Sequence, residues 1–189
     1  MELFGSSGIR GVANETVTPG FCLRVGMAVG TVVGGERVAV GRDTRATGNM
    51  FANAVVSGLQ SVGCDVDRLG VLPTPAAQLY AERETVPAVI ITASHNPAEY
   101  NGTKLVGADG IELPVEELER VETALDEDEF ARARWDGTGD ERRVESGREA
   151  YVEEVVGAVD RDRVGGADLT VALDPGHGAG ALTSPEIFR

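Results

Sequence analysis

Residues 86–97 read VPAVIITASHNP, and the organisation of the chain can be worked out from this stretch. Its first part, Val86 to Ala93, is an apolar run of the length and β-branched content that buried parallel strands have. Ser94, His95 and Asn96 follow at once, and Pro97 ends the turn. The sequence therefore predicts a buried strand whose end presents polar side chains.

Strand-like and helix-like segments alternate on both sides of this strand. Upstream, helical patterns start at Thr18-Pro19 and at Thr47, and short strands are predicted at 37–41 and 66–72, with a short helix through Gln78 and Tyr80. Downstream, 103–106 and 110–113 flank a glycine turn and predict a hairpin, and Pro114 opens a helix that reaches Asp126. This alternation predicts an α/β fold, a three-layer α/β/α sandwich with a mixed sheet.

The last third of the chain follows a different pattern. Residues 130–146 are charged and contain glycine, which is typical of a linker. A helix is predicted at 147–160 and a strand at 168–174, and a helix start at Ser184-Pro185 is cut off at Arg189. We therefore expect a first domain at 1–145 and a short stub of a second, similar domain at 146–189, so that the chain is a fragment.

Composition excludes several classes of function. The formal net charge is −14, and Lys104 is the sole lysine among 17 basic residues. Acid excess with lysine depletion favours either a salt-adapted, halophilic cytoplasm or a GC-rich genome. Nucleic acid is a poor partner because binding it needs a basic stripe. No apolar run could span a membrane and no signal peptide is present, so we expect a cytoplasmic protein. Its two cysteines are expected to be buried thiols.

Three polar loops predict a surface that handles phosphate. GRDTR at 41–45 and TASHNP at 92–97 each follow a strand, and functional loops of α/β sheets lie beyond the carboxyl ends of parallel strands. FGSSGIRG at 4–11 adds glycine backbone, two hydroxyls and Arg10. Arginine suits bidentate phosphate recognition, and glycine turns offer backbone N–H groups to anions.

Other interpretations of these motifs remain open at this point. Ser94 and His95 could indicate a serine hydrolase, but adjacent residues at a strand end point apart and no G-x-S-x-G elbow occurs. Ser94 and Asn96 could simply satisfy backbone groups in a tight turn. Residues 176–181, GHGAGA, match a dinucleotide fingerprint formally, although Asp174-Pro175 interrupts the strand before it, and no P-loop is present.

Taken together, the motifs resemble those of the α-D-phosphohexomutase superfamily. FGSSGIRG, GRDTR, TASHNP followed by NGTK at 101–104, and DPGHGAGA at 174–181 occur in the order and spacing of that family. The resemblance covers the whole chain and implies an intramolecular phosphotransferase of the phosphomannomutase, phosphoglucomutase or phosphoglucosamine mutase type. Such an isomerase interconverts hexose 6-phosphate and hexose 1-phosphate through a phosphoserine and a bisphosphate intermediate.

The resemblance also implies roles for individual residues. Ser94 would carry the phosphoryl group, His95 would donate toward phosphate or sugar oxygens, Lys104 would neutralise charge, and Arg10 would orient the sugar hydroxyl. Catalysis by such residues rests on positioning and charge stabilisation. Substrate binding is expected from Ser6, Ser7, Arg42, Asp43, Arg45 and Asn96. An Asp43 to arginine pair that only shapes its loop is equally compatible with the sequence.

Cofactors and partners follow from the same resemblance. Mg²⁺ is expected on a phosphoryl oxygen of Ser94, with its remaining ligands outside this sequence, since no D-G-D-G-D-R motif occurs. Hexose 1,6-bisphosphate is the expected activator, and a phosphorylated hexose is the expected substrate. The fragment is expected to be inactive alone. The alternative is a non-catalytic domain that binds a phosphosugar or a partner through the same loops. The sequence leaves the hexose and the oligomeric state open.

Overall fold

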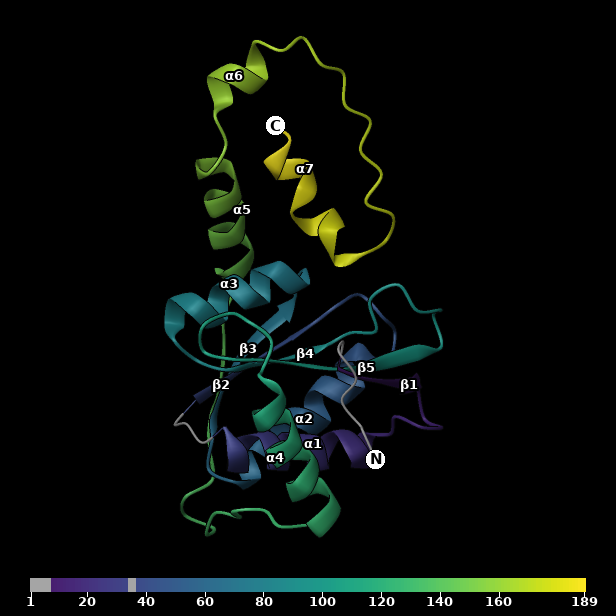
Figure 1. Ribbon diagram of the computed structural model, residues 1–189, viewed down its shortest axis with the longest axis vertical. Coiled ribbons are helices and arrows are strands. Elements are labelled where there is room, and N and C mark those ends of the chain that lie inside the picture. Colours follow the sequence, from purple (N-terminus) through teal and green to yellow (C-terminus); the bar gives the residue numbers. More distant parts are fainter. Residues whose placement is uncertain (1–7, 34–36) are drawn as a thin grey trace.

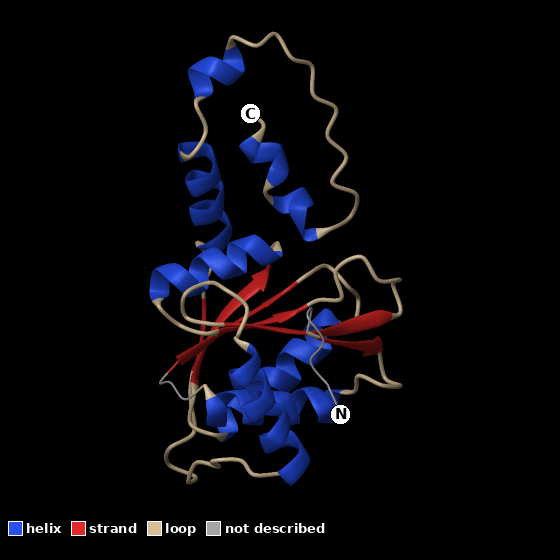
Figure 2. Ribbon diagram, in the orientation of Figure 1, coloured by secondary structure: helices blue, strands red, loops and turns tan. Residues whose placement is uncertain are grey.

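The fold is a single mixed sheet covered by helices on both faces (Figures 1 and 2). The computed structural model describes residues 8–33 and 37–189. The strands are β1 (Ile9–Val12), β2 (Arg37–Arg42), β3 (Asp65–Val71), β4 (Ala88–Ile91), β5 (Tyr100–Val106) and β6 (Glu141–Arg143). Their order across the sheet is β1-β5-β4-β2-β3-β6, and β5 runs antiparallel to both of its neighbours. The predicted α/β sandwich with a mixed sheet is confirmed.

The helices divide between the two faces of this sheet. They are α1 (Pro19–Val32), α2 (Gly48–Ser61), α3 (Thr74–Glu84), α4 (Val115–Glu127), α5 (Gly147–Gly157), α6 (Arg161–Gly165) and α7 (Ser184–Ile187), with one 3₁₀ turn η1 (Ala179–Leu182). Figure 1 shows α1, α2 and α4 on one face and α3 on the other. Thr18 accepts a hydrogen bond from the Phe21 N–H and Pro19 opens α1, as the sequence predicts.

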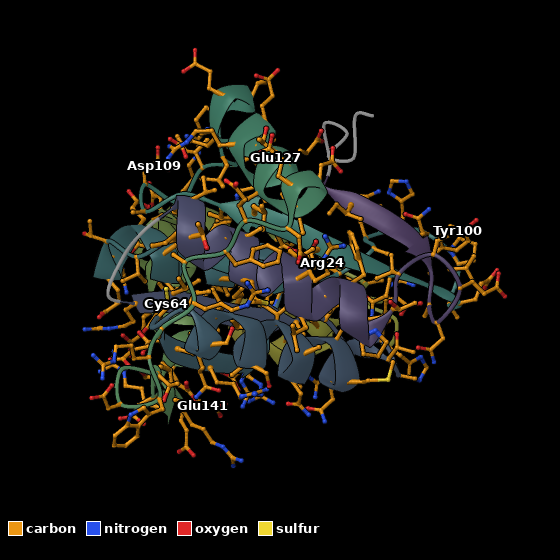
Figure 3. All side chains as sticks on the ribbon, turned by 90° about the horizontal axis from the view of Figure 1, so that it is seen from below. Arg24, Cys64, Tyr100, Asp109, Glu127 and Glu141 are labelled. Carbon is orange, nitrogen blue, oxygen red and sulfur yellow. The ribbon has the colours of Figure 1, made fainter. Side chains whose placement is uncertain are left out.

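Close packing of α1 on α2 depends on two glycines. A Cβ atom on Gly26 would lie 2.3 Å from the Val55 carbonyl oxygen, and one on Gly58 would lie 2.1 Å from the Leu23 carbonyl oxygen. Both distances are far inside van der Waals contact, so these glycines let the two helix backbones approach. The C-terminus of α4 is tied to this pair because Arg24 donates to the Leu125 carbonyl and pairs with Asp128 (Figure 3).

β4 is the most deeply buried strand. All four of its residues, Ala88 to Ile91, are buried, because β2 and β5 flank it and helices cover both of its faces. Its alternate side chains enter two separate cores: Val89 and Ile91 pack with α1 and α2, whereas Ala88 and Ile90 pack with α3. The buried strand predicted within 86–93 is therefore confirmed, with strand geometry at Ala88–Ile91, and the polar residues that follow it begin at a position set by the sheet.

Two strands lie where the sequence analysis places none. Residues 9–12 of the glycine-rich N-terminal motif form β1, and residues 141–143 of the expected linker form β6. β6 is polar and exposed throughout, so it shows no hydrophobic signal, and it joins the sheet by pairing parallel with β3. Figure 3 shows Glu141 of β6 and Tyr100 of β5 near opposite ends of the sheet.

A buried carboxylate fastens β6 to the sheet. Asp67 on β3 is 1% exposed; it accepts hydrogen bonds from Tyr80 (2.8 Å) and Arg142 (3.0 Å), and Arg37 lies 3.6 Å away. Burial by itself would raise the pKa of Asp67, but these hydrogen bonds and the two positive charges outweigh burial and leave the pKa below its usual value. Burial and the neighbouring carboxylate raise the pKa of Tyr80 to about 12.

Residues 146–189 extend away from the sheet (Figure 1). α5 contacts α3, and Tyr151 of α5 packs against the hydrophobic core between α3 and the sheet. The strand predicted at 168–174 is wrong, because these residues form no regular element and Leu169, Val171 and Leu173 are exposed. Within residues 8–33 and 37–189, no strand pairs with this apolar segment. Among the described residues, none of the helices has the length and apolar character needed to span a membrane.

Asp67 gives a testable stability prediction. Asp67→Asn should lower the free energy of unfolding at pH 7 by about 2 kcal/mol, because hydrogen bonds to a charged partner are lost. The folded-state pKa of Asp67 lies below the reference value of 3.8, so its contribution is complete above that value and is lost as the pH falls below it. Urea unfolding of wild type and variant should therefore converge as the pH is lowered. Asp126→Asn on the exposed face of α4 is the control; an equal loss in both variants would contradict the prediction.

Candidate active site

The candidate site lies where the loops after β2 and β4 meet. These neighbouring strands are parallel, so residues 42–45 and 92–97 leave the sheet at the same edge, and Asp43 N–H donates to the Ile91 carbonyl at 3.0 Å. The chain continues from β2 toward β3 but from β4 toward β5, on opposite sides. Such a divergence between adjacent strands is the place where open α/β sheets bind ligands.

Ser94 lies at the exposed tip of the second loop. Its φ of 52° is in the left-handed region, which non-glycine residues adopt only where the surroundings enforce it. Ser94 N–H donates to Thr92 Oγ1 at 3.0 Å, and Asn96 N–H donates to the Ala93 carbonyl at 3.0 Å. The turn therefore holds the hydroxyl-bearing residue outward, and His95 beside it is also exposed.

Arg45 holds this turn in shape from the neighbouring loop. Its Nη1 donates to the carbonyls of Pro97 (2.6 Å) and Tyr100 (2.9 Å), and its Nη2 donates to those of Ser94 (2.8 Å) and Asn96 (2.7 Å). One side chain thus satisfies four backbone oxygens that no sheet or helix pairs. The planar five-donor guanidinium is the side chain that can do this.

Asp43 orients Arg45 and also reaches the serine loop. Its Oδ1 accepts from the Arg45 backbone N–H at 2.9 Å, and its Oδ2 accepts from the Thr92 hydroxyl at 2.7 Å. Arg45 Nε lies 3.3 Å from the same Oδ2, an ion-pair contact whose geometry falls short of a hydrogen bond. These contacts fit the loop-shaping role of the Asp43 and Arg45 pair, one of the two roles that the sequence leaves open.

Arg10 reaches the same turn from the opposite side. It lies on β1 opposite Gly102 of β5, and its Nη1 donates to Asn96 Oδ1 at 3.2 Å. Asn101, which is fully buried, donates to Thr47 Oγ1 at 2.9 Å and so ties β5 to the residue before α2. The predicted residues Arg10, Asp43, Arg45, Ser94 and Asn96 are therefore brought together by contacts.

Lys104 and Arg42 have other partners. Lys104 forms an ion pair with Glu112, and its side chain is only 21% exposed. Arg42 donates to the Asp43 carbonyl at 3.1 Å and lines an open groove of about 980 Å³ between α2 and the β3–β6 edge. Ser94, His95, Arg10 and Lys104 do not line this groove. Ser6 and Ser7 lie outside the described residues.

Three residues of this arrangement are absent from the set predicted from sequence. Thr92 belongs to the quoted motif, yet only the fold shows that its hydroxyl joins Asp43 to Ser94. Thr44 donates to the His177 carbonyl at 2.8 Å, so the GHG segment after residue 175 touches the same loop. Glu112 follows the predicted glycine turn, and the sole lysine eight residues earlier was the signal that could have identified it as a partner.

The arrangement can present a hydroxyl to a ligand among cationic groups. Ser94 is exposed on a rigid turn, and the guanidinium groups of Arg10 and Arg45 contact that turn. An anion bound to Ser94 would meet positive charge in an otherwise acidic protein. No group of three or more His, Cys, Asp or Glu side chains within 8–33 and 37–189 could hold a metal ion.

The role of Arg45 gives a second prediction. Arg45→Lys keeps the charge but cannot reach four carbonyls, so backbone amides of 92–101 should exchange with deuterium at least about tenfold faster. Hydrogen–deuterium exchange measured by mass spectrometry checks this. Arg42→Lys is the matched control because Arg42 makes a single backbone hydrogen bond at the same strand end. Equal exchange of 92–101 in both variants would contradict the proposal that the hydrogen bonds of Arg45 hold this turn.

Comparison with known proteins places the chain in a family. Residues 1–132 match the family model described as phosphoglucomutase/phosphomannomutase, alpha/beta/alpha domain I. A phosphoglucomutase/phosphomannomutase of Thermococcus kodakarensis is 43% identical over 100% of this chain and 42% of its own length. A probable phosphoglucosamine mutase of Pyrococcus abyssi is 41% identical over 100% of this chain and 41% of its own length.

Solved structures agree with this assignment. A phosphoglucomutase/phosphomannomutase family protein from Burkholderia thailandensis superposes with a TM-score of 0.72 at 28% identity, covering 84% of this chain and 36% of that protein. The chain thus spans about two fifths of the length of the relatives it matches and has their fold over most of its residues. On the match over residues 1–132, the chain belongs to the phosphoglucomutase/phosphomannomutase family.

Proposed function

We propose that Ser94 of this chain carries a phosphoryl group and exchanges it with a phosphorylated hexose. The observation that carries the proposal is the Ser94 turn itself: an exposed hydroxyl residue at φ 52°, in a segment whose carbonyls at 94, 96, 97 and 100 accept four hydrogen bonds from Arg45. Residues held in strained conformations cluster at active sites and ligand clamps, and Ser94 combines that conformation with exposure and with the Arg45 contacts. The family relationship supplies the reaction class, the interconversion of hexose 6-phosphate and hexose 1-phosphate.

The transfer moves one phosphoryl group between two oxygens. A hydroxyl oxygen of the sugar bonds to phosphorus while the bond from phosphorus to Ser94 Oγ breaks, and a proton passes from the sugar hydroxyl to Ser94 Oγ. The bisphosphate then turns round, and its other phosphoryl group returns to Ser94. Rigid presentation of Oγ lowers the entropic cost of aligning the two oxygens.

The neighbouring side chains would position and stabilise the group in transfer. A phosphoserine carries about −1.5 to −2 charges near neutral pH. Arg10, fixed by Asn96, would orient the sugar hydroxyl, and a guanidinium acts here as a donor because it is rarely a base. His95 at the exposed tip would donate toward phosphate or sugar oxygens. Arg45 would act indirectly, by holding the turn on which phosphate is carried.

The described residues do not supply a complete set of ligands for Mg²⁺. A phosphoryl oxygen on Ser94 would be one ligand, yet the described part of the chain offers no cluster of metal-binding side chains beside it. Mg²⁺ needs near-octahedral oxygen coordination, so one oxygen does not fix it. No step of the proposed transfer is therefore assigned to a metal held by this chain.

The division into two parts belongs to the same proposal. Residues 1–145 would form the phosphoserine domain, and 146–189 would begin a second domain that approaches the site through the contact of Thr44 with His177. The relatives are more than twice as long as this chain, so the complete mutase cycle is expected of a longer protein.

Phosphoryl transfer to Ser94 can be tested on a chimera. This chain would replace the matching 42% of the Thermococcus kodakarensis relative, and the product would be incubated with hexose 1,6-bisphosphate. Intact-mass and peptide mass spectrometry should find one added phosphate, located on Ser94, together with hexose phosphate interconversion. Ser94→Ala should abolish both without loss of folding, because its side chain lies on an exposed turn.

The matched control is Ser57→Ala, which removes an exposed hydroxyl from α2. It should leave labelling and turnover unchanged. Interconversion that persists in Ser94→Ala, or a phosphate found on another residue, would overturn the proposal. Binding of hexose phosphate with no label on Ser94 would favour the non-catalytic alternative instead.

A further inference from the structure

We propose that Glu112 is a positioning residue that holds the ammonium group of Lys104 while Ser94 is unphosphorylated and releases it when Ser94 carries a phosphoryl group. The inference rests on the proposed function of Ser94. Glu112 thereby becomes a competitor of the phosphoserine for the sole lysine of the chain.

The backbone fixes Glu112 beside β5. After the turn at 107–110, Gly107 N–H donates to the Ile111 carbonyl at 2.7 Å and Leu113 N–H donates to the Leu105 carbonyl at 3.2 Å. Glu112 forms an isolated antiparallel bridge with Val106. Asp109 Oδ1 accepts from Ile111 N–H at 3.0 Å and stiffens the turn. The position of Glu112 is therefore set by the same strand that carries Lys104.

Glu112 and Lys104 lie on one face of the sheet. Val106 packs with α3, and Lys104, two residues before it on β5, lies on that same face. Glu112 is the partner of Val106 across the bridge, so it is the diagonal neighbour of Lys104, within reach of long side chains. This accounts for their ion pair.

The position of Lys104 relative to the Ser94 turn follows from the pairing of β5 with β4. Lys104 pairs with Ile90 of β4, and Thr92 N–H donates to the Gly102 carbonyl at 3.1 Å. Arg10 lies opposite Gly102, a residue without a side chain. Gly102 is therefore the residue between Lys104 and the Ser94 turn on this face of β5, and β5 is the neighbour of β4, the strand that precedes Ser94.

Of the cationic side chains near the Ser94 turn, Lys104 is the one best suited to change partner, from the Glu112 carboxylate to a phosphoserine. Arg10 donates to Asn96, and Arg45 is held by Asp43 and four carbonyls, so both guanidinium groups already have partners in the turn. An ammonium on a four-carbon stem has no fixed fork geometry and can change partners. Glu112 is 45% exposed, so its ion pair is weak, whereas a phosphoserine offers up to two negative charges.

The test uses this chain with phosphoserine installed at position 94 by genetic code expansion, so that no turnover is needed. The second pKa of the phosphoserine is then measured by ³¹P NMR. Glu112→Gln removes the anion that competes for Lys104, so the lysine pairs with the phosphate more completely, which should lower that pKa by about half a unit. Glu116→Gln on the first turn of α4 removes the same charge without an ion pair to Lys104 and should shift it much less. His95 is present in every sample, so its influence cancels.

A double-mutant comparison decides whether Lys104 mediates the effect. In a Lys104→Met background, Glu112→Gln should shift the phosphate pKa no more than Glu116→Gln does. Because Lys104 is the sole lysine, ¹³C-lysine labelling gives a single side-chain signal, which should move between the serine and phosphoserine forms. An unmoved signal, or a Glu112→Gln shift that survives Lys104→Met, would overturn the inference. Absence of labelling by hexose bisphosphate would overturn only the proposed function, since the phosphoserine here is installed.

Discussion

Arg45 supplies the constraint on which the candidate site depends. A turn that leaves a buried strand exposes carbonyl groups that the sheet does not pair, and four of them accept hydrogen bonds from this one guanidinium. The turn can therefore keep Ser94 in a left-handed conformation, which would otherwise cost of order 1–3 kcal/mol. Asp43 accepts hydrogen bonds from both Arg45 and Thr92, so it joins the loop after β2 to the loop after β4.

The fold explains why this unit can form. β2 and β4 are adjacent and parallel, although α2, β3 and α3 separate them in sequence, so their polar ends meet at one edge. Two cores hold β4 from opposite faces, and the lack of side chains at Gly26 and Gly58 lets α1 and α2 pack closely on one of these faces. The site is thus built from loops that follow buried strands paired within the sheet.

Much of this could be predicted from sequence because the signals are local. The apolar run before Ser94, Pro19 at the start of α1 and the glycine turn after Val106 each specify a conformation by their own chemistry, and the structure confirms them. β6 escaped prediction because its three residues are polar and exposed and depend on β3 for pairing. The strand predicted at 168–174 is the opposite case: the segment has an apolar pattern, but no neighbouring strand in the described structure pairs with it.

Roles within the site were harder to predict because they depend on contacts across the sheet. Arg45 was expected among the substrate-binding residues, yet its Nη donors are turned inward to backbone oxygens, which no local pattern reveals. Lys104 was recognised by its uniqueness, whereas its partner Glu112 became evident only from the register of β5 with the segment after the turn. Contacts join Arg10, Asp43, Arg45, Ser94 and Asn96 among the predicted residues, whereas Arg42 and Lys104 have other partners.

A crystal structure of the chain with phosphoserine at position 94 would test the central claim most directly, because it shows which carbonyl acceptors Arg45 retains. We expect its Nη atoms to remain on the carbonyls of Ser94, Asn96, Pro97 and Tyr100, with the phosphate directed to solvent. Arg45 withdrawn from those carbonyls and bound to the phosphate, with the turn rearranged, would contradict this account.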